Sequence, residues 1–179
     1  MTAKRSLPLA QVYRLIEPGP VVLLCTASGG RRNVMTQSWH TMIDFEPPLI
    51  GCVVSEANYT FAALEKTREC VISVPTVEIA AAVVGCGNTS GRTVDKFQAF
   101  GLTPERASLV AAPRIAECYA DLECRVIDAK LRHRYNLFVL QVLKAWRSIS
   151  RKPPRTLHHM GKGRFMVAGR TISLPSRMK

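Results

Sequence analysis

The chain has 179 residues, of which 47% are hydrophobic and 21% charged, the composition of a globular protein with a sizeable core. The formal net charge is +12, and no apolar run is long enough to span a bilayer, so we expect no transmembrane segment. The length favours one domain over residues 1–179, and the basic start lacks the long apolar region of a signal peptide, so we expect a cytoplasmic protein.

The first half of the chain alternates short apolar runs with turn-forming residues. The residues up to about Ile16 predict a short amphipathic helix, because Leu9, Val12 and Leu15 share one side with Ile16. Ser28–Arg32 reads as a hairpin loop. Strands are predicted at 21–27, 34–42, 49–55 and 70–74, and helices at 58–68 and 77–84, the second closed by Gly85 and Gly87.

The second half begins with a polar segment, 88–104, that contains a helical turn around residues 95–100. Two long β-branched runs, 115–127 and 136–146, suggest a long hairpin. The tail from residue 148 is rich in Pro and Gly and contains one late strand, 165–167. Short strands at close spacing with a few helices predict a mainly β fold, a β-barrel with added helices, and disfavour a Rossmann sheet.

Six cysteines, at positions 25, 52, 70, 86, 118 and 124, include no CxxC pair, which disfavours zinc ribbons and thioredoxin-like motifs. Cys25, Cys52 and Cys70 lie inside apolar runs and should pack as small reduced hydrophobes. Adjacent histidines such as His158 and His159 point to opposite faces of a strand, so we expect no metal site.

The positive charge is concentrated at one end of the chain. Residues 1–129 carry 12 Lys and Arg against 13 Asp and Glu, whereas residues 130–179 carry 13 Lys and Arg and no carboxylate. Such a field favours an anionic partner, either a phosphorylated cofactor, a pyridine dinucleotide or nucleic acid, but a solvated basic face fits as well. Aromatic residues are too sparse in this region to favour nucleic acid.

Two segments can hold an anion. Asn58 is a good N-cap for the helix that follows, with Ser55 upstream, and the Thr60 hydroxyl can add a hydrogen bond to an anion at that helix end. An ordinary capped helix explains the same pattern. The second segment is the polar loop that contains Ser90, Arg92, Lys96 and Phe97 and supplies cations.

A row of polar residues follows the hairpin loop. In a strand, Thr36 and Ser38 share one face while Gln37 and Trp39 share the other. The backbone of this stretch can donate to a ligand while Trp39 packs nearby, although a core aromatic is the plainer interpretation of Trp39. The whole row consists of Asn33, Met35, Thr36, Gln37, Ser38 and Trp39.

An ordered set of motifs covers nearly the whole chain and resembles the flavin reductase-like, FMN-binding split-barrel family, most closely its flavoredoxin branch. The motifs are VVLLCTASGG, NVMTQSWHT, PPL, ANYTFAAL and SGRTVDKF. The resemblance implies a split-barrel homodimer with FMN at the subunit interface. It implies that Asn33 and Trp39 lie near the isoalloxazine ring, that Thr60 and Lys96 bind the phosphate, and, with a looser local match, that His133 and Phe165 contact the flavin.

The resemblance implies a flavin reductase that passes electrons from NADH or NADPH, through FMN, to free flavin or another acceptor. The cofactor carries the chemistry, so no protein nucleophile is required. Two alternatives stay open. One is a non-enzymatic FMN electron carrier that docks a redox protein through the basic last third, and the other is a nucleic-acid-associated protein with a vestigial flavin fold.

Overall fold

The computed structural model describes residues 3–150 and 152–176 and consists mainly of antiparallel strands. The strands are β1 Lys4–Leu7, β2 Val22–Ser28, β3 Arg31–Gln37, β4 His40–Phe45, β5 Pro48–Val53, β6 Glu69–Val74, β7 Pro104–Glu105, β8 Arg114–Ile115, β9 Ala120–Asp128, β10 Leu137–Ser148, β11 Leu157–His159 and β12 Phe165–Val167. The helices are α1 Tyr13–Ile16, α2 Tyr59–Thr67, α3 Ala80–Asn88, α4 Lys96–Ala99 and α5 Arg132–Tyr135, with 3-10 turns at Leu9–Gln11 and Val77–Ile79.

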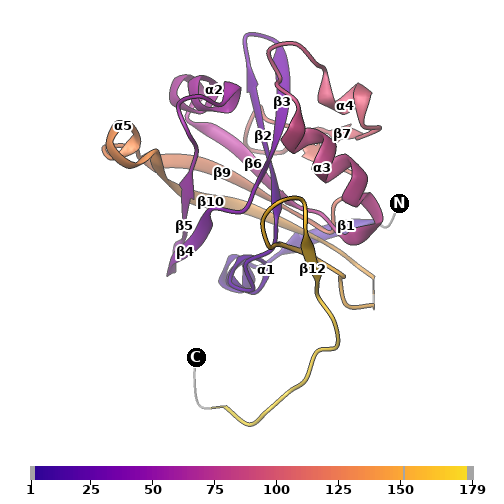
Figure 1. Cartoon of the computed structure of the whole chain (residues 1–179). Helices are drawn as coiled ribbons and strands as arrows, with labels where there is room; N and C mark the ends of the chain where they lie inside the picture. The colour runs from indigo at the N-terminus through magenta and orange to yellow at the C-terminus, as the bar shows by residue number, and fades with distance from the viewer. Residues whose placement is uncertain (1–2, 151, 177–179) are drawn as a thin grey trace.

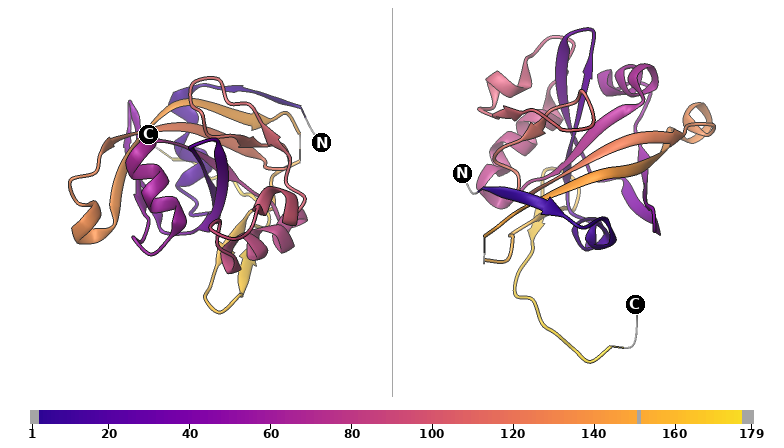
Figure 2. Two further views of the ribbon diagram at one scale, coloured as in Figure 1. Left: turned by 90° about the horizontal axis from the view of Figure 1, so that it is seen from above. Right: turned by 180° about the vertical axis from the view of Figure 1, so that it is seen from behind.

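One large sheet carries the fold. Its strand order is β3-β2-β6-β9-β10-β5-β4, with β1 paired to β10, and every pairing is antiparallel. The two end strands, β3 and β4, are consecutive in the chain, so the sheet curls until its ends approach each other (Figures 1 and 2). The mainly β architecture with added helices is therefore confirmed.

The prediction of one strand over 34–42 was wrong, because the chain breaks between β3 and β4 at Ser38 and Trp39. The Gln37 side chain spans this break. Its Nε2 donates to the carbonyl oxygens of Trp39 and Val53, each at 3.0 Å, and so links the end of β3 to β5. The Gln37 amide thus replaces the backbone hydrogen bonds between strands at the gap between the two ends of the sheet.

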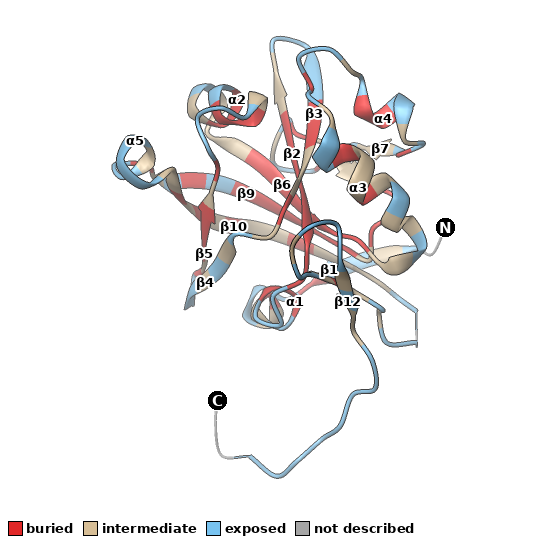
Figure 3. Cartoon of the chain, viewed as in Figure 1, coloured by how far each residue is buried: buried red, intermediate tan, exposed pale blue. Residues whose placement is uncertain are grey.

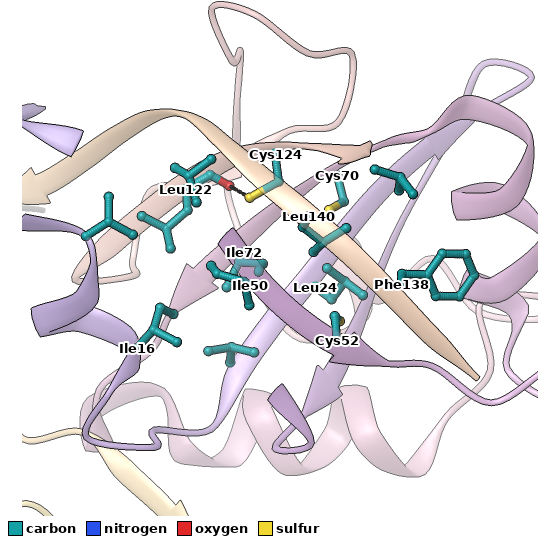
Figure 4. Close-up of a cluster of buried hydrophobic side chains, with 14 of the residues drawn as sticks. Ile16, Leu24, Ile50, Cys52, Cys70, Ile72, Leu122, Cys124, Phe138 and Leu140 are labelled. Atoms are coloured by element: carbon teal, nitrogen blue, oxygen red, sulfur yellow. Dashed lines mark hydrogen bonds between the residues drawn. The ribbon is translucent and has the colours of Figure 1, made fainter. Parts of the chain in front are cut away.

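The hydrophobic residues form two cores on the two faces of the sheet (Figure 3). The inner core fills the curled sheet and is closed by α1 and α2. Figure 4 shows Leu24, Ile72, Leu122 and Phe138 among its side chains. The outer core lies between β2, β3 and β6 and the layer formed by α3, α4 and the 100–118 segment. Strand β2 contributes to both cores, which explains why its sequence is a continuous apolar run.

All six cysteines are free and buried. Cys52 and Cys70 lie in the inner core and Cys25 in the outer core, which confirms that they pack as small hydrophobes. Burial raises the pKa of the Cys52 thiol to about 12, so this thiol stays protonated at neutral pH. No helix among the described residues is long and apolar enough to cross a membrane.

Three local predictions need correction. The predicted strand 115–127 begins later, at Ala120, because Arg114–Ile115 pairs with β7 instead. Strands β1 and β11 were not predicted, because both are short. Strand β1 also has a distant partner, since Lys4 pairs with Ser148 of β10, whereas β11 pairs with the nearby β12. The predicted pairing of the two long strands is confirmed, although their connection contains the unpredicted helix α5.

Helix α3 also extends further than predicted. It continues through Gly85 and Gly87 to Asn88. A Cβ atom at Gly85 would lie 2.3 Å from Cε1 of Phe100, so glycine is required here because the Phe100 ring packs directly on the helix backbone. The glycine that marked a helix end in the sequence is in fact a packing contact.

We therefore expect Gly85→Ala to destabilise the protein by about 1–3 kcal/mol, because the added methyl overpacks the Phe100 contact. This cost exceeds the gain of up to ~1 kcal/mol in helix propensity. Gly87→Ala is the matched control, since its Cβ would meet Thr36 at an ordinary 3.5 Å. Urea denaturation measures both variants. Equal stability of the two would show that Phe100 moves aside without cost.

Candidate functional site

The polar row of β3 meets helix α2 and the loop after α3. The side chain of Asn33 is buried, and its Nδ2 donates to Oγ1 of Thr60 at 2.9 Å. Its Oδ1 has no hydrogen-bond partner, although it is buried. A Cβ atom at Gly91 would lie 2.0 Å from this oxygen and 2.8 Å from the Tyr59 ring. The loop backbone thus lies directly against Asn33, and an unsatisfied acceptor remains at the junction.

The N-terminus of α2 provides donors at the same place. Asn58 has the extended backbone of an N-cap, but its side chain makes no capping bond. The N–H groups of Tyr59 and Thr60 therefore have no acceptor among the described residues. Arg92 donates to the Ala57 carbonyl at 3.2 Å and lies over the Tyr59 ring. Free N–H groups beside a guanidinium form an anion-binding corner.

The loop from Ser90 to Lys96 encloses this corner. Ser90 Oγ accepts from the Arg92 backbone N–H at 3.2 Å, so it shapes the turn that carries Arg92. Upstream of α2, Ser55 Oγ accepts from the Ala57 N–H at 3.3 Å. Both predicted serines thus support the backbone of the corner by fixing the segments on either side of it.

Lys96 is the most unusual charge in the structure. Only 4% of its surface is exposed, and its Nζ donates to the Cys86 carbonyl at 2.7 Å, in the last turn of α3. Within the described residues, no carboxylate pairs with it. Burial lowers the pKa of Lys96, although the Cys86 thiol opposes the shift. A buried cation without a carboxylate is costly unless an anionic ligand neutralises it.

A cavity of about 230 Å³ opens at the other end of β3. Thr36, Gln37 and Ser38 form one wall, and Gly87 of α3 and Phe165 of β12 face them. The Thr36 hydroxyl donates to the Val83 carbonyl, which holds β3 against α3. Gln37 Oε1 is a second buried acceptor without a partner. The row on β3 thus connects an anion-binding corner to this cavity, and it carries two buried acceptors without partners, one near each end.

Other predicted site residues lie elsewhere. Trp39 is 72% exposed, so its interpretation as a core aromatic was wrong. Met35 packs against the inner core and Phe97 is buried in the outer core, so both side chains are occupied by core packing.

His133 lies away from the cavity, on α5. Its Nδ1 contacts Glu56 at 2.6 Å, and its ring lies 6.0 Å from that of Phe61. The structure does not bring His133 to the cavity.

Two residues at the site, Arg31 and Gly91, were not predicted. Arg31 donates to the Gly91 carbonyl at 3.0 Å and lies over the Tyr59 ring, so it fixes the loop against α2. Gly91 belongs to the motif SGRTVDKF, and its missing side chain makes the contact with Asn33 possible. Its position in a Ser-Gly-Arg loop was the one available signal. Among the described residues, no cluster of metal-ligating side chains is present.

Comparisons with known proteins agree on the family. The model of the flavin reductase like domain matches residues 13–166. The chain is 29% identical to protein YddH of Escherichia coli, covering 92% of this chain and 95% of YddH. An FMN-binding domain of flavin reductases-like enzyme from Shewanella baltica superposes with a TM-score of 0.91 at 27% identity, covering 97% and 98% of the two chains. Flavoredoxin from Methanosarcina acetivorans shares the fold, with a TM-score of 0.78, 24% identity, and coverage of 88% and 89%.

Proposed function

The chain belongs to the flavin reductase-like domain family, and from this premise we propose that it binds FMN and acts as an oxidoreductase. The proposed reaction takes electrons from NADH or NADPH and passes them to free flavin or another acceptor. The observation that carries the proposal is the buried Lys96, whose positive charge has no carboxylate partner in the described part of the chain.

The residues present fit FMN on two grounds. The phosphate of FMN requires donors and positive charge, and the free N–H groups of Tyr59 and Thr60 lie beside Arg92. The ribityl hydroxyls and the ring imide are donors, and the buried oxygens of Asn33 and Gln37 are acceptors without partners. Between these two residues β3 rises roughly 13 Å, at about 3.3 Å per residue, which suits an extended ligand lying along the strand.

When bound, FMN supplies hydride acceptance from a nicotinamide and electron release to an acceptor. The protein contributes position and electrostatics. The corner at α2 holds the phosphate, Lys96 offsets the negative charge, and Asn33 and Gln37 orient the hydrogen-bonding groups. Thr36, Ser38 and Phe165 line the cavity that receives the ring and exclude water from it. The structure requires no catalytic nucleophile for this role.

The test of this function is the visible spectrum of FMN-reconstituted, desalted protein, followed by addition of NADH or NADPH without oxygen. We expect a retained flavin spectrum that bleaches promptly. A retained spectrum that does not bleach would instead identify a carrier that awaits a protein donor. A protein that retains no flavin and shows none in a titration would overturn the proposal.

The alternative function is an FMN electron carrier that docks an acidic redox protein. The charge distribution supports it, because residues 130–179 carry 13 Lys and Arg side chains and no Asp or Glu, and such a surface attracts an acidic protein. Three of these cations, Arg151, Arg177 and Lys179, lie outside the described residues. Electron transfer that depends steeply on salt, together with no oxidation of NAD(P)H, would favour it over the reductase.

A homodimer forms part of the proposal. On and beside the end strand β4, the apolar side chains of Trp39, Ile43 and Phe45 are exposed, as expected for a surface that contacts a second copy. The reaction is proposed to take place in the cytoplasm, where the six free thiols stay reduced. Analytical ultracentrifugation tests the dimer, and a monomer at micromolar concentration would exclude it.

We also expect Gly91→Ala to weaken FMN binding at least tenfold. The added methyl would clash with Asn33 and Tyr59 and push the loop away from the phosphate corner. Flavin fluorescence titration measures the affinity. Gly169→Ala is the control, since nothing lies within 4 Å of its Cβ position. Unchanged affinity in Gly91→Ala would separate this loop from the binding site.

A further inference from the structure

The β11–β12 hairpin forms the outer wall of the cavity at the end of β3. His159, Gly163 and Phe165 from the hairpin face Gln37 and Ser38 across the cavity. Seen from above, the hairpin projects outward next to α3 (Figure 2). A second ligand that stacks on a ring in this cavity would therefore lie close to the hairpin.

The hairpin is firmly attached to the body of the protein. Leu157 is buried in the outer core, and its carbonyl accepts from the Val21 N–H at 2.7 Å. The rings of His159 and Phe165 lie 5.4 Å apart across the two strands. The turn of the hairpin is closed by the Met160 N–H, which donates to the Arg164 carbonyl at 2.8 Å. The side chains of the turn are thus presented at a fixed place.

The turn holds a lysine in an uncommon conformation. Gly161, Lys162 and Gly163 all have positive φ, with Lys162 at 49°. Glycine or asparagine would adopt this backbone at lower cost, so a lysine here is unfavourable for the fold alone. Strain of this kind often marks residues retained for binding.

Two cations of the turn are available to a ligand. Lys162 and Arg164 are exposed, and neither side chain forms an ion pair with any described residue. None of the residues that line the cavity is acidic. The phosphate corner of the proposed FMN site lies at the other end of β3, beside Asn33 and Thr60, so these two cations are not needed there.

We propose that Lys162 and Arg164 bind phosphate groups of a pyridine dinucleotide whose nicotinamide enters the cavity. This inference rests on the proposed function, because the nicotinamide would stack on the flavin ring that the cavity is proposed to bind. The phosphate groups have two sources, the pyrophosphate shared by NADH and NADPH and the 2′-phosphate of NADPH alone. Both are polyanions that match exposed, unpaired Lys and Arg side chains.

The test is calorimetric titration of FMN-reconstituted protein with NADP⁺ and NAD⁺, which requires no turnover. The test variant is Lys162→Asn with Arg164→Gln, because asparagine tolerates the positive φ and so preserves the turn. The control is Lys130→Gln with Arg134→Gln, which removes two other exposed cations, one just before α5 and one on it. We expect the hairpin variant to bind NADP⁺ at least about tenfold more weakly, and the control to bind within about twofold of the wild type.

The two nucleotides separate the sources of phosphate. A loss confined to NADP⁺ assigns the cations to the 2′-phosphate, and an equal loss for NAD⁺ assigns them to the pyrophosphate. Wild-type affinity of the hairpin variant for both nucleotides, or no binding of either by the wild-type protein, would overturn the inference. Flavin retention is measured on the same samples. Retained FMN with unchanged nucleotide binding rejects this inference alone, whereas absent FMN rejects the proposed function.

Discussion

Replacing Lys96 by methionine is expected to weaken FMN binding by about 10- to 100-fold while changing the unfolding free energy of the FMN-free protein by less than about 1 kcal/mol. A hydrogen bond to a charged group contributes ~1.5–3 kcal/mol, which corresponds to this change in affinity. Stability is nearly unchanged because two effects oppose each other. The variant loses the bond to the Cys86 carbonyl, but it also loses a buried charge without a carboxylate partner.

Flavin fluorescence titration and urea denaturation check the two parts of this prediction. Lys66→Met is the control, because Lys66 is an exposed lysine in the last turn of α2. Lys96 begins α4, but its ammonium also lies at the C-terminal end of α3, where a cation stabilises the helix dipole. A variant that keeps its FMN affinity but unfolds at lower urea would show that Lys96 serves only as this helix cap.

Deprotonation of Lys96 should change both the unfolding free energy and the FMN affinity with pH, in opposite directions. Burial lowers its pKa in the folded protein below the ordinary value of 10.5. The charged form therefore costs stability at neutral pH, and the unfolding free energy of the FMN-free protein should rise as pH increases from the lowered pKa towards 10.5. FMN affinity should fall over the same window, because the phosphate requires the protonated amine. Both changes should be absent from Lys96→Met.

Replacing Asp121 by asparagine is expected to destabilise the protein by about 3–5 kcal/mol, because it breaks a buried ion pair. Asp121 is fully buried, and Oδ2 accepts from Lys4 Nζ at 2.5 Å. Oδ1 accepts from Ser73 Oγ at 2.7 Å and from the Ile115 N–H at 3.2 Å. Burial raises the pKa of this carboxyl, and its donors oppose the shift. Neutralising it would leave the Lys4 ammonium buried without a counter-charge.

Urea denaturation measures the loss, and Arg125→Gln is the control. Arg125 forms a more exposed ion pair with Glu69 at 3.8 Å, so its removal should cost less than about 1 kcal/mol. The double variant Lys4→Met with Asp121→Asn should lose less than the sum of the single variants, because the two side chains are directly coupled. Additive losses would show that Lys4 is hydrated and that β1 is held by its backbone pairing with β10 alone.

Local patterns in the sequence were sufficient for much of the architecture. The apolar run at 21–27 became β2, which is buried on both faces, and Asn58 stands at the start of α2 as an N-cap should. The alternating pattern of 136–146 became β10. These features depend on neighbours a few positions apart, so the sequence contains the information. The break at Ser38 was missed because it depends on Gln37 reaching β5.

The candidate site shows the same division. The sequence predicted Asn33, Thr36, Gln37 and Thr60 as polar site residues, and the structure brings Asn33 and Thr60 into direct contact. The sequence did not indicate that Lys96 is buried, because the burial of a lysine in a polar segment depends on how α3 and α4 pack. The role of Gly91 was also hidden, because its position in a Ser-Gly-Arg loop does not reveal which distant side chain the loop backbone approaches.

The sequence by itself determined the mainly β class, the family resemblance and the concentration of positive charge in the last 50 residues, because these are properties of composition and order along the chain. The tertiary structure decided which charges lack partners. Lys4, Lys96 and Lys162 are alike in the sequence, yet one is paired with Asp121, one is buried without a carboxylate, and one is exposed beside the cavity. Burial and distance between remote segments set these differences, and only folding fixes them.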